Sequence, residues 1–192
     1  MELRQRAAGG QILTRLYRLA NFRSIALATV AYVLFLTLVM APQAEVMQQT
    51  AGEWGAPDGH FVYTPDEMYR HLSAWETEAR AAYTKFRLTL DPLWALVYGS
   101  FLLTITGTAL RRCVDTDSSW RKLILLPLLP MSADIAENFF GIALVAALPE
   151  RIEWLAWLMA ATTSFKWLTL ALAHIVMVAA VAAALACAWR NR

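Results

Sequence analysis

Four segments of this chain are each apolar over about the length that crosses a lipid bilayer, and this pattern limits the fold more than any other feature. A spanning helix needs about 20 mostly apolar residues. The segments cover residues 24–41, 92–110, 123–148 and 165–189. Apolar residues make up 58% of the 192 residues, against roughly 45–50% in soluble domains. We predict an all-α, polytopic membrane protein: a four-transmembrane-helix bundle forming a single domain, 1–192.

The basic residues are unevenly distributed among the connections between these segments. They gather before the first span, between the second and third, and after the fourth, while the other connections carry a surplus of Asp and Glu. The positive-inside rule then predicts that both termini lie in the cytoplasm. The basic residues on the predicted cytoplasmic side are Arg4, Arg6, Arg15, Arg18, Arg23, Arg111, Arg112, Arg121, Lys122, Arg190 and Arg192.

The first span is interpreted as an uncleaved anchor. The stretch before it is long and carries arginines, and removal of the span would break the charge pattern. Within that stretch, residues 1–21 predict a short helix on the anionic inner leaflet, or else a basic tail that only sets topology. Cys113 and Cys187 fall at predicted cytoplasmic ends, so we expect no disulfide.

Residues 42–90 form the main region outside the predicted spans. The first part is rich in turn formers and predicts a loop. Thr64-Pro65-Asp66-Glu67 is typical of a capping box and starts an amphipathic helix, which we expect to break at Asp91-Pro92. This helix is expected to cover the bundle as a lid, to lie on the outer leaflet or to dock a partner.

Two further irregularities are expected near the last two spans. Pro127 and Pro130 should bend the third span and leave carbonyls near Leu123 and Leu126 without their usual partners. Residues 150–159 contain Trp154 and predict a short interfacial step before the fourth span.

The third span contains an acidic cluster at Asp134, Glu137 and Asn138. The spacings of three and four residues place these side chains on one face of a helix, where ionisation in a bilayer is costly. At least one carboxyl should be protonated unless a cation or a charged ligand compensates. The alternatives are a polar clasp that only fixes helix packing, and a transition-metal site, for which His174 is the sole nearby nitrogen ligand.

Counting helical rises of about 1.5 Å from the cytoplasmic boundary places Tyr98 and His174 in the same layer as the acidic cluster. Asp91 and Lys166 lie nearer the outer boundary and are candidates to pair. Lys166 is alternatively expected to extend to the interface or to pair with Glu137. The candidate ligand-binding residues are Asp134, Glu137, Asn138, Tyr98 and His174, and Asp91 and Lys166 are the candidate supporting ion pair.

The motifs of phosphate-binding loops, serine hydrolases, zinc proteases and haem sites are absent from the sequence. We therefore predict no cofactor, no metal and no catalytic residue, and a non-enzymatic role is favoured. The predicted function is the binding or passage of a small cationic or amphipathic ligand, a proton or a monovalent cation. The alternative is an accessory or assembly subunit of a larger membrane complex. Expected partners are membrane lipids, a lipid-like or cationic ligand, and further copies or subunits, with no nucleic acid.

Asp91-Pro92, Pro130, the Asp134-x-x-Glu137-Asn138 element and Lys166-Trp167 together resemble a family of small bacterial four-span inner-membrane proteins. The resemblance covers about the last two thirds of the chain, Tyr98 included. It implies the four-span fold and no particular activity. The long outer region after the first span is also similar in layout to the sterol-binding EXPERA proteins, with no residues that align.

Overall fold

The computed structural model describes residues 2–190, with side chains from residue 11 onward, and this part of the chain is helical without strands. Four helical stretches are long and apolar enough to cross a membrane: Phe22–Ala51, Thr77–Cys113, Ser119–Ala147 and Glu153–Arg190. The prediction of an all-α fold with four long apolar helices is therefore confirmed. The side chains of Arg4, Arg6 and Arg192, which entered the charge pattern, lie outside the described residues.

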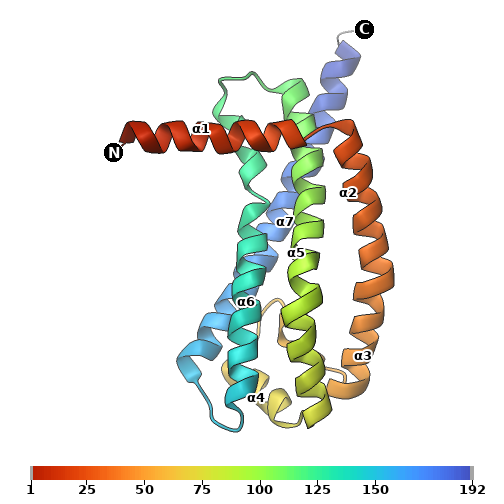
Figure 1. The fold of residues 1–192 in the computed structure, drawn as a ribbon, viewed down its shortest axis with the longest axis vertical. Helices are drawn as coiled ribbons and strands as arrows, with labels where there is room; N and C mark the ends of the chain where they lie inside the picture. Colours follow the sequence, from red (N-terminus) through yellow and green to blue (C-terminus); the bar gives the residue numbers. More distant parts are fainter. Residues whose placement is uncertain (1, 191–192) are drawn as a thin grey trace. The chain divides into compact units, whose positions relative to one another are not determined.

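The helical elements follow one another with short connections (Figure 1). In chain order they are α1 (Glu2–Leu19), α2 (Phe22–Phe35), a π turn (Leu36–Met40), α3 (Ala41–Ala51), a 3₁₀ turn (Pro57–Gly59), α4 (Pro65–Ser73), α5 (Thr77–Cys113), a 3₁₀ segment (Ser119–Leu125), α6 (Leu128–Ala147) and α7 (Glu153–Arg190). Internal contacts divide the chain into unit 1 (Met1–Tyr32, Val97–Leu129 and Thr169–Arg192) and unit 2 (Val33–Leu96 and Pro130–Leu168).

Unit 1 is organised around the contact of α1 with the end of α5 and the 3₁₀ segment. Figure 1 shows α1 lying across the end of α5. The Tyr17 hydroxyl donates to the Arg121 carbonyl at 2.9 Å, and Arg111 Nη1 donates to the Tyr17 carbonyl at 3.3 Å. The Arg121 guanidinium also stacks over the Tyr17 ring, 4.9 Å from its centroid. The helix predicted within residues 1–21 is thus present, and its contact with a lipid leaflet stays a prediction.

Gly107 of α5 allows a close contact with the α1–α2 connection and with the 3₁₀ segment in unit 1. A Cβ at this position would lie 2.7 Å from Ala20 Cβ and 2.6 Å from Ile124 Cδ1. Ala20 and Ile124 are both fully buried. Because the Ala20 methyl group is fixed to its backbone, a larger residue at 107 requires the helices to move apart.

In unit 2 the first apolar helix continues past Pro42, where the sequence predicts a loop. The residue before the proline, Ala41, donates its backbone N–H to the Leu36 carbonyl, which closes the wider π turn Leu36–Met40. Pro42 then occupies the first turn of α3, where a missing N–H donor costs little. The predicted end of the first span is therefore wrong, and the loop is confined to residues 52–64.

The amphipathic helix is divided at a different place from the one predicted. The Thr64 capping box is present at the start of α4, but the helix ends at Ser73, and α5 then runs without interruption from Thr77 through Pro92. The break is stabilised locally, because Arg80 Nε donates to the Trp75 carbonyl at 3.0 Å. The predicted break at Asp91-Pro92 is wrong, since neighbouring helices sustain prolines inside helices of this apolar type.

The prolines of the third span lie where the helix type changes. The 3₁₀ segment ends at Leu125, and α6 begins at Leu128, so Pro130 lies in its first turn. The carbonyls of Leu123 and Leu126 accept bonds from the backbone N–H groups of Leu126 and Leu129, at 3.1 Å each. The expectation that these carbonyls lack partners is therefore wrong, because i→i+3 bonds replace the α-helical ones.

The expected interfacial step at residues 150–159 is also absent, because α7 begins at Glu153 and continues to Arg190. Trp154 and Trp157 lie on this first part of the helix with exposed side chains. A helix of 38 residues is about 57 Å long at 1.5 Å per residue. It is longer than the about 30 Å of a hydrocarbon core.

The core of unit 2 is formed by α4 packed on the adjoining parts of α5, α6 and α7. Met68, Tyr69 and Leu72 of α4 are fully buried against it, and the backbone N–H of Ile152 donates to the Tyr69 hydroxyl at 2.7 Å. Of the three predicted arrangements of the amphipathic helix, α4 adopts the lid. The core residues of unit 2 are Met47, Tyr63, Met68, Tyr69, Leu72, Trp75, Ala79, Tyr83, Leu144, Val145, Leu155, Ala156, Met159 and Ala160.

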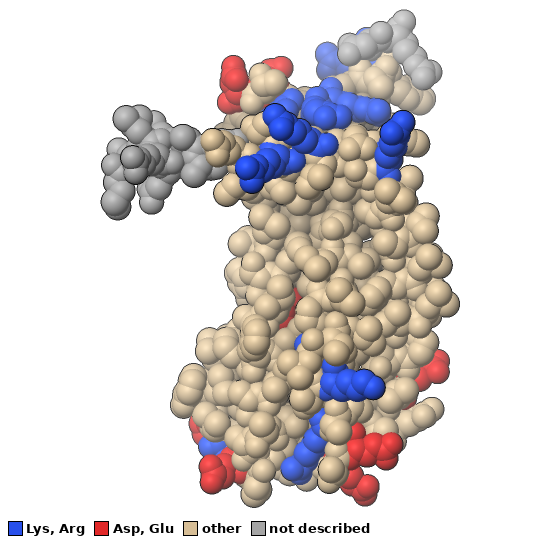
Figure 2. Space-filling view, viewed as in Figure 1, with Lys and Arg blue, Asp and Glu red and all other residues tan. Residues whose placement is uncertain are grey.

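The charged surface differs between the two units (Figure 2). On the face shown, Lys and Arg side chains of unit 1 gather around α1 and the start of α2, whereas both acidic and basic side chains occur on the surface of unit 2. No charged residue occurs between Arg23 and Glu45. Only 6% of the most apolar part of Phe22–Ala51 is buried, against 61% for Thr77–Cys113. Large apolar side chains of the first helix are therefore left uncovered.

We expect Gly107→Ala to lower the free energy of unfolding by about 1–3 kcal/mol, because the added methyl group overfills a close contact. Unfolding in mixed detergent micelles, followed by circular dichroism, measures the change. Gly59→Ala is the matched control, since a Cβ there meets no atom within 4 Å. Equal stability of the two variants would contradict the close packing at Ala20.

Candidate functional site

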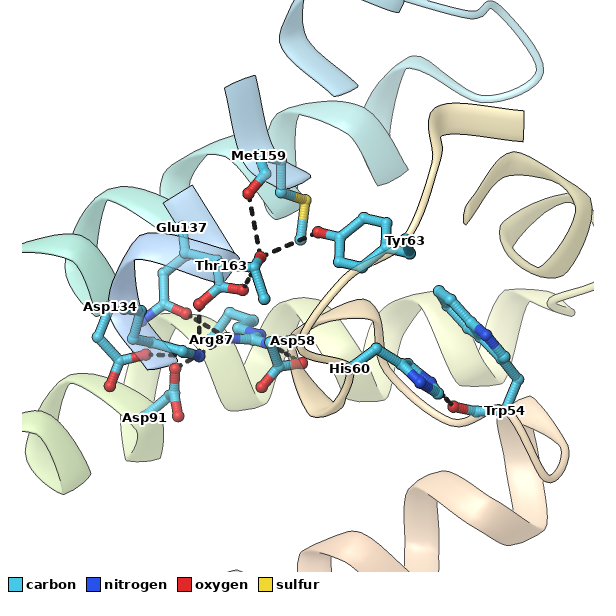
Figure 3. Close-up of polar contacts among 12 residues, drawn as sticks. Trp54, Asp58, His60, Tyr63, Arg87, Asp91, Asp134, Glu137, Met159 and Thr163 are labelled. Carbon is cyan, nitrogen blue, oxygen red and sulfur yellow. Dashed lines mark hydrogen bonds and ion pairs between the residues drawn. The ribbon is translucent and has the colours of Figure 1, made fainter. Parts of the chain in front are cut away.

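Unit 2 buries a network of charged and polar side chains contributed by three helices and a loop (Figure 3). The α5 residues are Arg87 and Asp91, the α6 residues are Asp134, Glu137 and Asn138, and the α7 residues are Thr163 and Lys166, all of which are buried. Asp58 and Tyr63 join them from the loop.

Arg87 is the centre of the first half of the network. Its Nη1 donates to Asp91 Oδ2 at 3.0 Å and to Asn138 Oδ1 at 2.7 Å, and its Nη2 forms an ion pair with Asp58 Oδ1. The guanidinium lies over the Tyr83 ring, 4.9 Å from its centroid. Arg87 and Asp91 face each other because they are one helical turn apart on α5. The guanidinium, only 2% exposed, thereby holds two carboxylates and one amide.

Lys166 is the centre of the second half. Its Nζ lies 2.5 Å from Glu137 Oε2 and 3.4 Å from Asp134 Oδ1. Asp134 and Glu137 present their carboxyls on one side of α6, as their spacing predicts. The ammonium group therefore occupies the space between two acids one turn apart.

A hydroxyl chain reaches Glu137 from the loop. Thr163 Oγ1 lies 2.5 Å from Glu137 Oε1 and 3.0 Å from the Met159 carbonyl, and the Tyr63 hydroxyl lies 3.0 Å from Thr163 Oγ1. Thr163 and Glu137 are both fully buried. The two oxygens of Glu137 thus meet different groups, an ammonium on one side and a hydroxyl on the other.

Two hydrogen bonds from side chains of α7 hold the loop against this helix. Trp167 Nε1 donates to the Asp58 carbonyl at 3.0 Å, and Ser164 Oγ donates to the Phe61 carbonyl at 2.8 Å. Burial raises the pKa of the Asp58 carboxyl, but the Arg87 guanidinium and, to a lesser degree, Lys166 lower it more, so the pKa lies below its usual value. Asp58 is therefore an anion at neutral pH.

The charges of the network do not balance when every group is ionised. Two cations, Arg87 and Lys166, face four carboxyl groups: Arg87 is shared by Asp58 and Asp91, and Lys166 by Asp134 and Glu137. Burial of unpaired charge costs several kcal/mol per ion. The network thus has a deficit of two positive charges, which protons or another cation would supply.

Gly141 makes room for the aromatic ring beneath Arg87. A Cβ at Gly141 would lie 2.1 Å from the Tyr83 hydroxyl and 3.2 Å from Met159 Cε. Tyr83 is 1% exposed and packs between Trp75, 5.2 Å away between centroids, and Arg87. Gly141 continues the face of α6 that carries Asn138, so this face combines polar groups with the closest approach to α5.

A pocket of about 280 Å³ adjoins the Arg87 half of the network within unit 2. Residues 40–48 of the π turn and α3, loop residues 53–60, and Tyr83, Phe86 and Arg87 of α5 contribute its lining. Trp54 is held at this pocket by stacking on the His60 ring at 4.4 Å between centroids, and His60 Nε2 lies 2.8 Å from the Trp54 carbonyl. The pocket therefore combines apolar and aromatic walls with two charged members of the network.

The structure brings Asp134, Glu137, Asn138 and Lys166 together. Lys166 forms ion pairs with Glu137, which was its alternative predicted partner, and with Asp134. Asp91 pairs with Arg87 instead of with its candidate partner Lys166, because Arg87 lies one turn from Asp91 on the same helix.

Tyr98 and His174 belong to unit 1. His174 Nδ1 lies 2.8 Å from the Leu170 carbonyl of its own helix, and Tyr98 is buried. Their common layer with the acidic cluster stays a prediction.

The sequence analysis did not identify four members of the network: Arg87, Asp58, Tyr63 and Thr163. Arg87 follows Ala79 and Tyr83 at four-residue spacing and so continues the buried face of the helix. The Arg87 and Asp91 spacing was a second usable signal. No local pattern distinguishes Asp58 from other turn residues or Thr163 from the other span threonines.

No family model, curated protein or solved structure matches this chain. Among the described residues, no group of three or more His, Cys, Asp or Glu side chains is arranged to hold a metal ion.

Arg87→Met is expected to lower the free energy of unfolding by about 3–5 kcal/mol, because Asp58 and Asp91 lose their buried cation. Addition of Asp58→Asn and Asp91→Asn should restore part of this loss. Lys85→Met, at an exposed position two residues away, is the control and should change stability by no more than about 0.5 kcal/mol. Mixed-micelle unfolding measures all of these. A loss for Arg87→Met no larger than for Lys85→Met would contradict the pairing.

The Asp58 contact should also set part of the pH dependence of stability. Its pKa is lowered in the folded protein, so its contribution is complete above the unfolded-state pKa of about 3.9 and is lost as the pH falls through the lower folded-state pKa. The stability difference between the unaltered protein and Asp58→Asn should therefore stay constant from pH 7 to about 5 and shrink below about 4. Mixed-micelle unfolding at each pH tests this, and a difference that shrinks between pH 7 and 5 would contradict it.

Proposed function

We propose that this chain is an integral protein of the bacterial inner membrane that crosses it four times, with both termini in the cytoplasm. Four long apolar helices support this, as does the uncovered apolar surface of the first helix. The basic residues of unit 1 and the acidic residues around the loop and α4 of unit 2 agree with the positive-inside rule.

In this membrane, the proposed function is proton-linked binding or passage of a small cationic or amphipathic ligand. The observation that carries the proposal is the sharing of each buried cation by two carboxyl groups. A bilayer interior does not sustain the resulting excess of negative charge. Uptake of protons removes that excess without any change in packing, and Lys166 Nζ already occupies the space between Asp134 and Glu137 that a bound metal ion would need.

The adjoining pocket supports a link between protons and a ligand. Asp58 and Arg87 belong both to its lining and to the network. A ligand that draws Asp58 away from Arg87 changes the positive charge available to Asp91 and Asn138. A group shared in this way couples ligand binding to proton binding. Each event then changes the affinity for the other by the same factor.

The alternative is an accessory or assembly subunit in which the network is a structural clasp. The specific observation in its favour is that Lys166 fills the gap between the two acids of α6. The uncovered apolar helix Phe22–Ala51 would then contact another subunit. Co-purification of a stable partner from mild detergent, insensitive to Glu137→Gln, would favour this alternative.

A protonated carboxyl group should be detectable by infrared spectroscopy of the protein in lipid nanodiscs. We expect a carboxyl C=O stretching band that changes on a shift from pH 8 to 5, and loss or displacement of this band in Asp134→Asn or Glu137→Gln. The expected cause is the charge deficit around Lys166.

Glu78→Gln, at an exposed position of α5, removes a carboxyl outside the network and is the control. Both network variants should still insert and fold, as circular dichroism shows. A pH-dependent band that persists in both network variants, or its absence from the unaltered protein, would contradict the proposed function.

A further inference from the structure

A continuous chain of hydroxyl groups connects the loop of unit 2 to Glu137 (Figure 3). Tyr63 OH and Thr163 Oγ1 are 3.0 Å apart, and Thr163 Oγ1 and Glu137 Oε1 are 2.5 Å apart. Tyr63 itself is 5% exposed, but the preceding side chain, Val62, is 70% exposed. The bond between Tyr63 and Thr163 is itself buried, so the chain leads from a buried hydroxyl of the loop to a fully buried carboxyl group.

Thr163 has one hydroxyl proton and more than one acceptor. When Glu137 is ionised, Thr163 donates to Glu137 Oε1 and accepts from Tyr63. When Glu137 is protonated, its own O–H donates to Thr163, which then turns its proton toward the Met159 carbonyl at 3.0 Å. Both protonation states of Glu137 thus keep every hydroxyl proton in a hydrogen bond.

We propose that Tyr63 and Thr163 form a proton relay between the loop of unit 2 and Glu137. This inference rests on the proposed proton-linked function and adds the route by which the proton reaches the site. A hydronium ion that reaches the Tyr63 oxygen gives it a proton as the Tyr63 proton moves to Thr163 Oγ1 and the Thr163 proton moves to Glu137 Oε1. Each hydroxyl oxygen gains one proton and loses one, so only Glu137 changes its charge.

A hydroxyl group meets Glu137 at Oε1, and a charged group meets its other carboxylate oxygen. Lys166 from α7 meets the other carboxylate oxygen, while Arg87 from α5, Asp58 from the loop and Asp134 from α6 are the further charged groups near it. Lys166 and Arg87 are cations engaged in ion pairs. A proton arriving from their side would meet positive charge, whereas Tyr63 and Thr163 are neutral.

The loop is also fixed well enough to keep the relay aligned. The bonds of Trp167 to the Asp58 carbonyl and of Ser164 to the Phe61 carbonyl join the loop to the α7 residues that flank Thr163. The Tyr63 ring packs within the core of unit 2 and makes an edge contact with Trp54, 6.1 Å between centroids. Proton transfer along hydrogen bonds needs this kind of held geometry.

The test is the rate at which Glu137 takes up a proton after a pH jump, followed by time-resolved infrared spectroscopy in lipid nanodiscs. The Glu137 band is assigned by its loss in Glu137→Gln. Tyr63→Phe and Thr163→Val should each slow protonation at least about tenfold while leaving its final extent unchanged. Thr163→Ser retains the hydroxyl and should keep the original rate. Thr162→Val is the matched control, because Thr162 donates only to the Leu158 carbonyl of its own helix.

Each outcome decides a separate point. Equal rates in the unaltered protein, Thr163→Val and Tyr63→Phe would overturn the relay and leave the proposed function standing. Absence of a pH-dependent Glu137 band from the unaltered protein would overturn the relay, because no proton then reaches Glu137. Slowing in Thr163→Ser equal to that in Thr163→Val would show a packing effect and would also overturn the relay. If Tyr63→Phe fails to fold, the Thr163 variants alone decide.

Discussion

A positive charge persists in an apolar interior only beside groups that neutralise it, and unit 2 places two such charges among helices that are otherwise apolar. Arg87 is held by Asp58, Asp91 and Asn138, and Lys166 by Asp134 and Glu137. These partners come from the loop, α5 and α6, so the positions of all three depend on the same electrostatic requirement. The apolar core that contains Tyr83 and residues of α4 packs beside the network.

This requirement accounts for features that local propensity opposes. Proline in a helix interior costs about 3 kcal/mol, yet α5 passes through Pro92 directly after Asp91. A break there would separate Asp91 from Arg87, one turn earlier, and remove a buried ion pair. The absence of a side chain at Gly141 likewise lets Tyr83 lie under Arg87. At Pro92 and Gly141, an unfavourable local conformation is thus offset by the pairing of a buried charge.

The sequence was informative wherever a pattern extends over many residues. Apolar runs predicted the four long helices, and spacing on a single helix predicted that Asp134, Glu137 and Asn138 share a face. It was misleading at the prolines, because the π turn before Pro42 and the first turn of α6 at Pro130 accommodate a missing donor in ways that only the surrounding backbone decides. The sequence did not indicate the roles of Asp58 and Thr163. Asp58 pairs with Arg87, 29 residues away, and Thr163 contacts Glu137, 26 residues away.

The ion pair between Glu137 and Lys166 has a consequence for how such a chain enters a membrane. The two residues lie on consecutive helices, α6 and α7, joined by a short turn. A charged side chain carried alone into a bilayer costs at least about 2.5–3.5 kcal/mol on insertion scales. When α6 and α7 enter together as a hairpin, the ammonium group travels with its carboxylates, and the hairpin carries fewer exposed charges than its two helices taken singly. In the membrane location proposed above, paired insertion of α6 and α7 is thereby favoured over sequential insertion.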